Sequence, residues 1–160
     1  MARIVLCCGK VSSGKTTFSK HLESEQGFFP FSADEWMLHF YGEPAEREVF
    51  EQSLSRCKEM IYRLSERLLA RGQDVVLDFG FWKREERERV RARFEALGHD
   101  VALVYFPIDE ARQMSFLHTR QASGQGEHYV FDAAGLVVLN SMFECPVEEE
   151  AALSPESFHQ

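Results

Sequence analysis

Residues 9–16 read GKVSSGKT and match the pattern GxxxxGK[ST] at every fixed position. An unbroken apolar run, Ile4–Cys8, precedes them, and a segment with helical spacing, Lys15–Glu25, follows. Such an apolar run is typical of a strand that is buried on both faces. The stretch therefore lies between a buried strand and a helix, which is the context in which this pattern binds phosphate.

The residue types of this stretch suit phosphate binding. Its glycines allow backbone N–H groups to close around phosphate oxygens, and the N-terminus of the following helix is electropositive. We expect Lys15 to reach the β- and γ-phosphates of a nucleotide and the hydroxyl of Thr16 to bind Mg²⁺. The predicted nucleotide-binding residues are Gly9, Ser12, Ser13, Gly14, Lys15, Thr16 and Thr17.

The rest of the chain alternates strand-like and helix-like segments. Apolar runs predict further strands at Phe28–Ser32, Asp74–Phe79 and Val101–Phe106. Helical patterns follow or separate them at Glu46–Arg71, Lys83–Leu97, Asp109–Gln121 and Ala133–Phe143. Because parallel strands need such crossovers, this order predicts an α/β fold with a parallel sheet. A fifth strand near Ala151 has little support in the sequence.

Length and charge limit the kinds of protein that the chain can be. Its 160 residues include 18 Lys+Arg and 26 Asp+Glu, for a net charge of -8. We expect a single domain over residues 1–160, with an acidic tail at about 147–160. The acidic balance disfavours nucleic acid as a partner, since such binding depends on Lys and Arg. No apolar run approaches the ~20 residues of a membrane span, so we expect a cytoplasmic protein without a membrane partner.

Two aspartates occur where predicted strands end. Ser32 and Glu35 fit a capping box, which places Asp34 in the first turn of a helix. The helix dipole stabilises an anionic carboxylate there, and a general base must be ionised to act. The position of Asp34 therefore favours the ionised form that a base needs, and a role in the cap alone is the alternative. Asp78 ends an apolar strand, where a carboxylate can hold Mg²⁺.

The phosphate loop, the segment 32–35, the strand that ends at Asp78 and the region of Arg120 together resemble a group of small P-loop kinases. This group includes chloramphenicol phosphotransferase, the kinase domain of polynucleotide kinase and zeta-toxin-type kinases. The resemblance covers residues 3–150. It implies a three-layer P-loop NTPase fold, with a sheet in the order 2-3-1-4-5, and phosphoryl transfer from ATP with Mg²⁺.

The resemblance also implies roles for single residues. Asp34 would accept the proton of the attacking hydroxyl, and Asp78 would hold Mg²⁺ or contact the acceptor. Arg120 would stabilise the transferring phosphoryl group beside a short lid at about residues 121–133. The chain departs from the pattern at Phe116, where relatives often carry a second arginine, and Arg112 is a possible substitute. The resemblance further implies that residues 143–146 lie beside the adenine.

The sequence gives less specific evidence about the residues around the predicted acceptor site. Aromatic residues at 79–82, with Trp36 and Tyr41, suggest an acceptor that has an apolar or planar part. The segment 83–93 is rich in arginine, but interleaved glutamates indicate a solvated helix face. Arg84 and Arg87, near the start of this segment, are the two arginines that we expect could reach a substrate.

These features predict an ATP-dependent phosphotransferase that moves the γ-phosphoryl group to a hydroxyl of a small molecule. One alternative is a kinase of nucleosides, nucleotides or polynucleotide 5'-hydroxyls, although the net charge of -8 disfavours a polynucleotide. Another is a regulatory ATP-binding protein without an acceptor. A Ras-type GTPase is excluded, because residues 78–81 do not form the DxxG motif.

Overall fold

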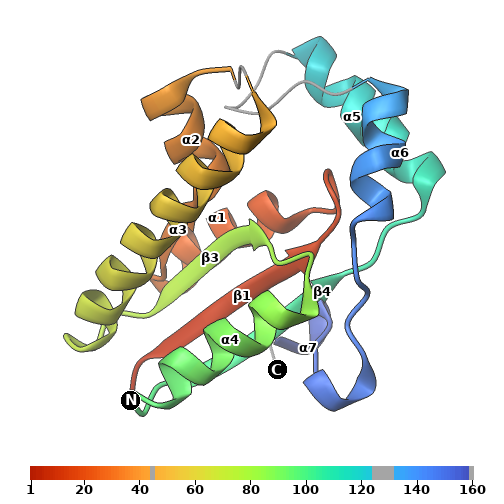
Figure 1. Cartoon of the computed structure of the whole chain (residues 1–160). Coiled ribbons are helices and arrows are strands. Elements are labelled where there is room, and N and C mark those ends of the chain that lie inside the picture. The colour runs from red at the N-terminus through yellow and green to blue at the C-terminus, as the bar shows by residue number, and fades with distance from the viewer. Residues whose placement is uncertain (44–45, 124–131, 159–160) are drawn as a thin grey trace.

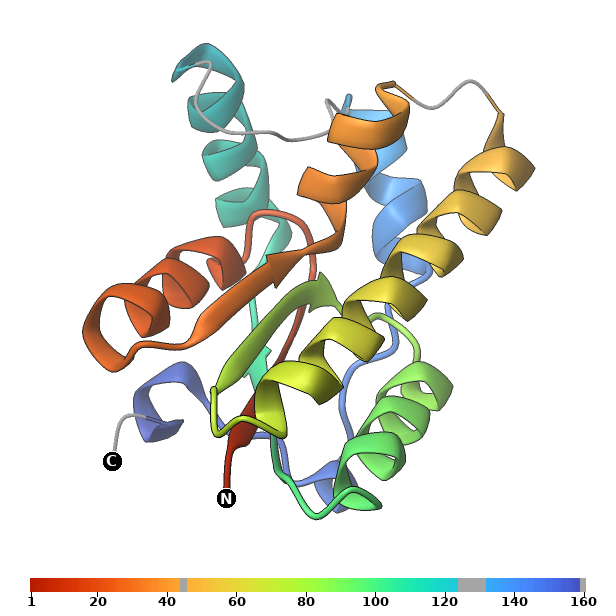
Figure 2. The same cartoon turned by 90° about the vertical axis from the view of Figure 1, so that its left-hand side faces the viewer.

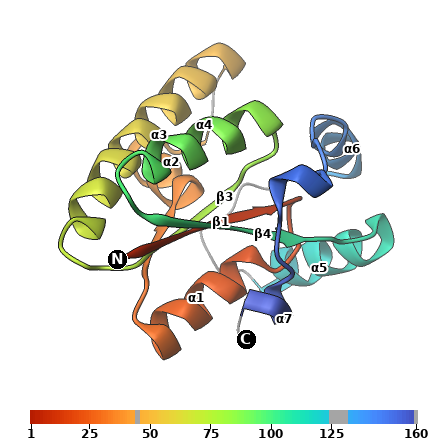
Figure 3. The ribbon, with the colours of Figure 1, turned by 90° about the horizontal axis from the view of Figure 1, so that it is seen from below.

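The computed structural model describes residues 1–43, 46–123 and 132–158. Its strands form a parallel sheet that has helices on both faces (Figures 1 and 3). The strands are β1 (Arg3–Gly9), β2 (Phe29–Ser32), β3 (Val75–Gly80) and β4 (Asp100–Phe106). The helices are α1 (Lys15–Gln26), α2 (Ala33–Tyr41), α3 (Arg47–Leu69), α4 (Arg84–Glu95), α5 (Glu110–Ser123), α6 (Ala133–Ser141) and α7 (Pro155–Phe158), with a 3₁₀ turn η1 (Glu148–Glu150). The predicted α/β fold is confirmed.

The sheet has the order β2-β3-β1-β4, and all paired strands are parallel. This order matches the first four places of the predicted order 2-3-1-4-5. In the fifth place, Leu153 forms a single parallel bridge with Val104. Ala151, with φ of 49°, turns the chain before the bridge, and Pro155 starts α7 after it. Only a short extended segment remains between these two residues, so the fifth strand is reduced to one bridge.

The central strand β1 explains how the helices are held on the sheet. Its side chains alternate between two apolar clusters, and residues 4–8 are completely buried. One cluster packs against α3 and α4, and the other packs against α1 and α7. Figure 3 shows these two pairs of helices on opposite faces of the sheet. The predicted strand that is buried on both faces is therefore confirmed.

The C-terminal tail is fastened to α4 by a buried ion pair. Arg87 is only 2% exposed, and its Nε and Nη2 donate to the two carboxylate oxygens of Glu150 at 2.6 and 2.9 Å. Arg87 Nη1 also donates to the backbone oxygens of Phe81 and Glu144, both at 2.9 Å. The expectation that Arg87 could reach a substrate is wrong, because these buried partners use its donors. Arg84 instead pairs with Glu88 on the exposed face of α4.

The predicted helix start at Ser32 is confirmed. The Ser32 hydroxyl accepts a hydrogen bond from the backbone N–H of Glu35 at 3.2 Å, and α2 follows directly. The predicted lid at 121–133 falls mainly on residues 124–131, which lie outside the described residues. Its first residues belong to α5, and Asp132 caps α6. In the part of the chain that is described, no helix is both long and apolar enough to cross a lipid bilayer.

Candidate active site

The predicted phosphate loop joins β1 to α1 at the carboxyl edge of the sheet, near α2 and α5 (Figures 1 and 2). The ammonium group of Lys15 donates to the backbone oxygens of Gly9 at 3.0 Å and Lys10 at 2.6 Å, and to the hydroxyl of Ser13 at 3.3 Å. The cation therefore lies inside the loop. Burial lowers the pKa of Lys15, and the nearby charge of Asp78 opposes this effect.

Two features of the loop fit a bound phosphate. Ser12 has φ of 61°, and its buried hydroxyl has no hydrogen-bond partner among the residues described. A buried hydroxyl without a partner is unfavourable, and a phosphate oxygen would accept a hydrogen bond from it. Gly14 has φ of 101°, and a Cβ atom there would meet nothing within 4 Å, so the loop is open at this point. Thr17 lies exposed in the first turn of α1.

The backbone at Gly9 packs so closely against its neighbours that a side chain would not fit there. A Cβ atom on Gly9 would lie 2.6 Å from the Ser13 hydroxyl oxygen and 2.9 Å from the backbone oxygen of Phe106. A contact of 2.9 Å to the backbone of β4 could be relieved only by moving that strand. The first glycine of the motif therefore allows the loop to lie tightly against the sheet.

Thr16 and Asp78, the two predicted metal-binding residues, are in direct contact. The Thr16 hydroxyl donates to a carboxylate oxygen of Asp78 at 2.7 Å. Mg²⁺ prefers oxygen ligands and keeps several waters, so one hydroxyl and one carboxylate are a suitable donor set. Asp78 pairs in register with Ser32 of β2, which brings the start of α2 next to the loop.

Asp34 lies at the start of α2, and the other charged residues of the site surround it. It is exposed to solvent, yet the protein around it raises the pKa of its carboxyl group, and the charge of Asp78 raises it further. The positive charges of Lys15, Lys58 and Arg120 act in the opposite direction. Its carboxylate forms no hydrogen bond with any part of the chain that is described. Asp34 is therefore an exposed carboxylate whose pKa responds to the charges of Lys15 in the phosphate loop and of Asp78.

The sequence predicted a site that contains Lys15, Asp34, Asp78 and Arg120. In the structure, the charges of Lys15, Asp78 and Arg120 all act on the pKa of Asp34. Sequence reasoning missed Lys58, which lies on α3. A lysine on a long amphipathic helix has no special spacing, so no sequence signal could have identified it. Arg112, the possible substitute for a second lid arginine, lies over the ring of Phe116 at 6.0 Å on the exposed face of α5.

Trp82 connects the segment after β3 to the phosphate loop. Its indole N–H donates to the backbone oxygen of Gly9 at 3.2 Å, the same oxygen that Lys15 contacts. The chain turns back toward the loop through Gly80, with φ of 84°, and Phe81, with φ of 47°. Phe81 is fully buried and Trp82 contacts the nucleotide loop, so these two aromatic residues do not form the acceptor surface that the sequence suggested.

A second buried contact connects α5 and α6 to the loop. The amide nitrogen of Gln113, which is completely buried, donates to the backbone oxygen of Val11 at 2.9 Å. Gln113 and Asn140 also exchange hydrogen bonds between their side-chain amides at 2.8 and 3.2 Å. Near the predicted adenine loop, the ring of Phe143 stacks on Tyr105, and the ammonium group of Lys10 lies 6.0 Å from its centre. The helices on either side of residues 124–131 are thus fixed to the phosphate loop.

Solved structures share this fold at low sequence identity. A protein from Chloroflexus aurantiacus J-10-fl superposes with a TM-score of 0.71 at 19% identity, covering 91% of this chain and 78% of that one. Kti12 from Chaetomium thermophilum, solved with ADP-AlF3, has a TM-score of 0.66 at 15% identity and covers 91% and 82%. A gluconokinase from Sinorhizobium meliloti 1021 has a TM-score of 0.62 at 18% identity and covers 96% and 81%.

No curated protein matches the chain by sequence. The sequence profile of the AAA_33 family, described as an AAA domain, matches residues 4–142. This match includes the phosphate loop, Asp34, Asp78 and Arg120, and it covers most of the chain. The chain therefore belongs to the AAA_33 family of P-loop proteins.

Proposed function

We propose that the protein transfers the γ-phosphoryl group of ATP to a hydroxyl group of a small molecule. One observation carries this proposal: a carboxylate without a hydrogen-bond partner in the described chain, Asp34, lies among the charges of Lys15, Asp78 and Arg120 at an open phosphate loop. A protein that only binds nucleotide needs the loop but does not need a carboxylate that can accept a proton. A phosphotransferase needs such a group to accept a proton.

The reaction assigns one task to each residue. Asp34 accepts the proton of the acceptor hydroxyl while the hydroxyl oxygen bonds to the γ-phosphorus, and the bond from that phosphorus to the departing ADP oxygen breaks. Lys15 and Arg120 bring positive charge to the transferring group, on which negative charge is spread during the reaction. Mg²⁺ held by Thr16 and Asp78 would neutralise further charge on the phosphates.

The raised pKa of Asp34 suits this task. A carboxylate with a higher pKa is a stronger proton acceptor, and it serves as a base wherever the pH remains above that pKa. Protein atoms that displace part of the water around its carboxyl group, together with the charge of Asp78, raise the pKa, whereas the charges of Lys15, Lys58 and Arg120 oppose this increase. The environment therefore strengthens the base without requiring it to be neutral.

The fold supports a small acceptor. Solved structures with this fold include proteins named as a sugar kinase and a gluconokinase. The fold also occurs in a complex named for RNA repair, but the net charge of -8 supports a small molecule over a polynucleotide.

The test is transfer of label from γ-labelled ATP in the presence of Mg²⁺. Separate pools of metabolites, nucleosides, oligonucleotides and hydroxyl-bearing antibiotics are read by mass spectrometry, with Lys15→Ala as the variant that cannot hold the phosphates. We expect a labelled small molecule with the wild-type protein and none with Lys15→Ala. ATP hydrolysis without any labelled product, at a rate that Asp34→Asn leaves unchanged, would contradict the proposal and favour a regulatory ATPase.

A further inference from the structure

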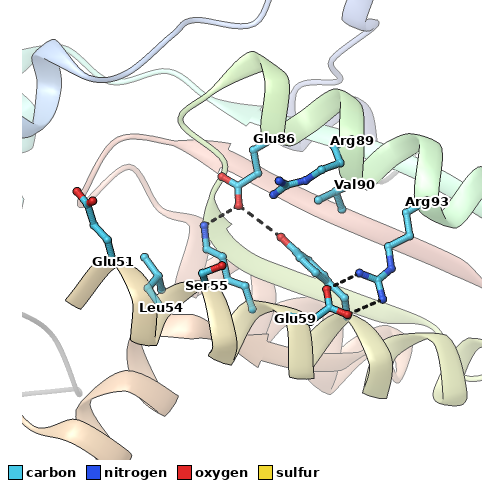
Figure 4. A pocket seen from close by; sticks show the side chains of 10 residues that line it. Glu51, Leu54, Ser55, Glu59, Glu86, Arg89, Val90 and Arg93 are labelled. Carbon is cyan, nitrogen blue, oxygen red and sulfur yellow. Dashed lines mark hydrogen bonds and ion pairs between the residues drawn. The ribbon is translucent and has the colours of Figure 1, made fainter. Parts of the chain in front are cut away.

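A groove of about 400 Å³ runs between α3 and α4, outside the phosphate loop (Figure 4). Its lining includes the apolar atoms of Leu54, Tyr62 and Val90 together with charged side chains. The full lining consists of Glu51, Leu54, Ser55, Lys58, Glu59, Tyr62, Glu86, Arg89, Val90 and Arg93. This volume is within the range of cavities that bind small molecules.

The groove adjoins the acceptor side of the candidate active site through Lys58. The Lys58 ammonium group pairs with Glu86 at 2.7 Å and lies 5.7 Å from the ring centre of Phe79, the residue that follows Asp78. Both side chains of the ion pair are only 17% exposed. The charge of Lys58 also acts on Asp34. Asp78, which precedes Phe79, pairs with Ser32, two residues before Asp34. The Lys58 end of the groove is therefore the end that faces the strand ends where Asp34 and Asp78 lie.

The charges in the groove are balanced except at one residue. The other charged lining residues form ion pairs, which are Lys58–Glu86 at 2.7 Å, Arg93–Glu59 at 2.7 Å and Glu51–Arg47 at 2.8 Å. Arg89 has neither a hydrogen bond nor an ion pair with the residues that the structure describes. Figure 4 shows its guanidinium group turned toward the groove, on the same side as Glu86. The groove thus has one arginine whose donors are available to a ligand.

Arg89 and the apolar lining residues together indicate what kind of ligand the groove would bind. A guanidinium group binds carboxylate and phosphate oxygens through two parallel hydrogen bonds. The apolar atoms of Leu54 and Val90 suit a carbon skeleton. A ligand with a carbon body and one anionic group would contact both.

We propose that this groove binds the non-reacting part of the acceptor, which carries a carboxylate or phosphate group. The anion contacts Arg89, and the hydroxyl group at the other end is presented to Asp34. The acceptor is thus a hydroxy acid or a hydroxylated phosphate ester. This proposal rests on the proposed phosphotransferase function.

The test measures binding and transfer separately. The phosphate loop is first filled with Mg·ADP, so that added anions cannot bind there. Thermal stabilisation is then titrated with two carboxylates, gluconate and glycerate, and with two phosphate esters, glucose 6-phosphate and glycerol 3-phosphate. Glucose and glycerol serve as neutral counterparts. Transfer from γ-labelled ATP to the same six compounds is measured in parallel.

Three variants separate the groove from general effects of charge. Arg89→Ala removes the proposed contact, and Arg89→Lys keeps the charge without the two parallel donors. Arg67→Ala is the control, because Arg67 is exposed on α3 and has no side-chain partner in the described chain. We expect one of the anionic pairs to bind, Arg89→Ala to weaken that binding about tenfold or more, and Arg89→Lys to weaken it less. Arg67→Ala should bind like the wild type.

The outcomes distinguish the two proposals. Equal binding of anionic and neutral compounds, or equal loss in Arg89→Ala and Arg67→Ala, overturns the groove as an anion site. Transfer to the neutral compounds that Arg89→Ala leaves unchanged also overturns it, while the phosphotransferase function stands. Binding of anions that depends on Arg89, without transfer of label to the anions that bind, keeps the anion site but overturns its assignment to the acceptor; the phosphotransferase itself is decided by the labelled pools described above.

Discussion

The nucleotide loop and the acceptor side are built from different interactions. Hydrogen bonds hold the loop in shape, and they come from Lys15, Trp82 and Gln113 to its backbone oxygens. On the acceptor side, Asp34 faces charges from α1, α3 and α5 without a hydrogen bond to the described chain. Contacts within the protein thus hold the backbone of the loop, whereas no hydrogen bond in the described chain holds the carboxylate of Asp34. We infer that the loop determines phosphate binding and that acceptor specificity depends on residues from several helices.

The largest effect is expected at the buried ion pair between α4 and the C-terminal tail, where Arg87 also bonds to the backbone of Phe81, the residue before Trp82. Arg87→Met leaves the buried carboxylate of Glu150 without its partner, and the backbone oxygen of Phe81 loses a donor. Removing one member of a buried ion pair costs about 3–5 kcal/mol of unfolding free energy. Urea unfolding at neutral pH measures this loss. Arg84→Met, on the exposed face of the same helix, is the control and should change stability by less than about 1 kcal/mol.

The same ion pair gives the wild-type protein a pH-dependent stability. Hydrogen bonds from Arg87 lower the pKa of Glu150 below its ordinary value of 4.5. The folded state therefore holds this proton less tightly than the unfolded state, so the stabilisation is present above pH 4.5 and is lost as the pH falls toward the lowered pKa. Unfolding experiments between pH 7 and 3 should show a steeper loss in the wild type than in Glu150→Gln. Parallel curves would contradict this assignment.

A smaller effect is expected from the turn that delivers Trp82 to the loop. Gly80→Ala places a Cβ atom 2.8 Å from the indole nitrogen of Trp82, at a φ of 84°. Gly98 has nearly the same φ, 81°, but a Cβ atom there meets nothing within 4 Å. Gly98→Ala should therefore cost only the backbone strain, about 1–2 kcal/mol. Gly80→Ala should cost more and should also weaken Mg·ATP binding, as measured by unfolding and calorimetry. If Gly80→Ala and Gly98→Ala lose equal stability and both bind Mg·ATP like the wild type, the position of Trp82 does not depend on this turn.

A still smaller effect is expected when only the hydrogen bond of Trp82 is removed. Trp82→Phe removes the N–H donor to Gly9 but keeps an aromatic ring. Loss of one such bond should weaken Mg·ATP binding by about 0.5–1.5 kcal/mol, or about two- to tenfold. Trp36→Phe, on α2, removes the other tryptophan and should leave nucleotide affinity unchanged. If both variants bind Mg·ATP like the wild type, the indole has no role in shaping the loop.

The pKa of Asp34 can be changed by a substitution at Lys58, and we predict the direction of this change. The charge of Lys58 lowers the pKa of Asp34, so Lys58→Met should raise it. Because Asp34 must be ionised to accept a proton, the acid limb of kcat/KM should move to higher pH. The pH profile of phosphoryl transfer measures this shift, with Lys20→Met, an exposed residue of α1, as the control. A limb that stays in place, or that moves to lower pH, would contradict the link between Lys58 and Asp34.

The sequence predicted the parts of the molecule that depend on neighbouring residues. The loop at residues 9–16, the cap at Ser32 and the buried strands could all be recognised, because their interactions lie within a few residues or follow a simple period. Arg87 was expected to reach a substrate because it lies near the start of an arginine-rich segment, whereas its partner Glu150 is 63 positions away. For the same reason Lys58 and Gln113 escaped notice, and Trp82 was assigned to the acceptor surface and not to the phosphate loop. Their contacts depend on how distant segments pack, which no local pattern records.

The account depends most on Asp34 as the base that activates the acceptor. The direct test measures two quantities in Asp34→Asn: the affinity for Mg·ATP by calorimetry, and the rate of phosphoryl transfer from γ-labelled ATP. We predict that transfer falls by about 10²–10⁴-fold, the usual contribution of a general base, while the affinity for Mg·ATP stays close to that of the wild type. Transfer at the wild-type rate, or an affinity that falls as far as the rate, would contradict the assignment of Asp34 to the acceptor.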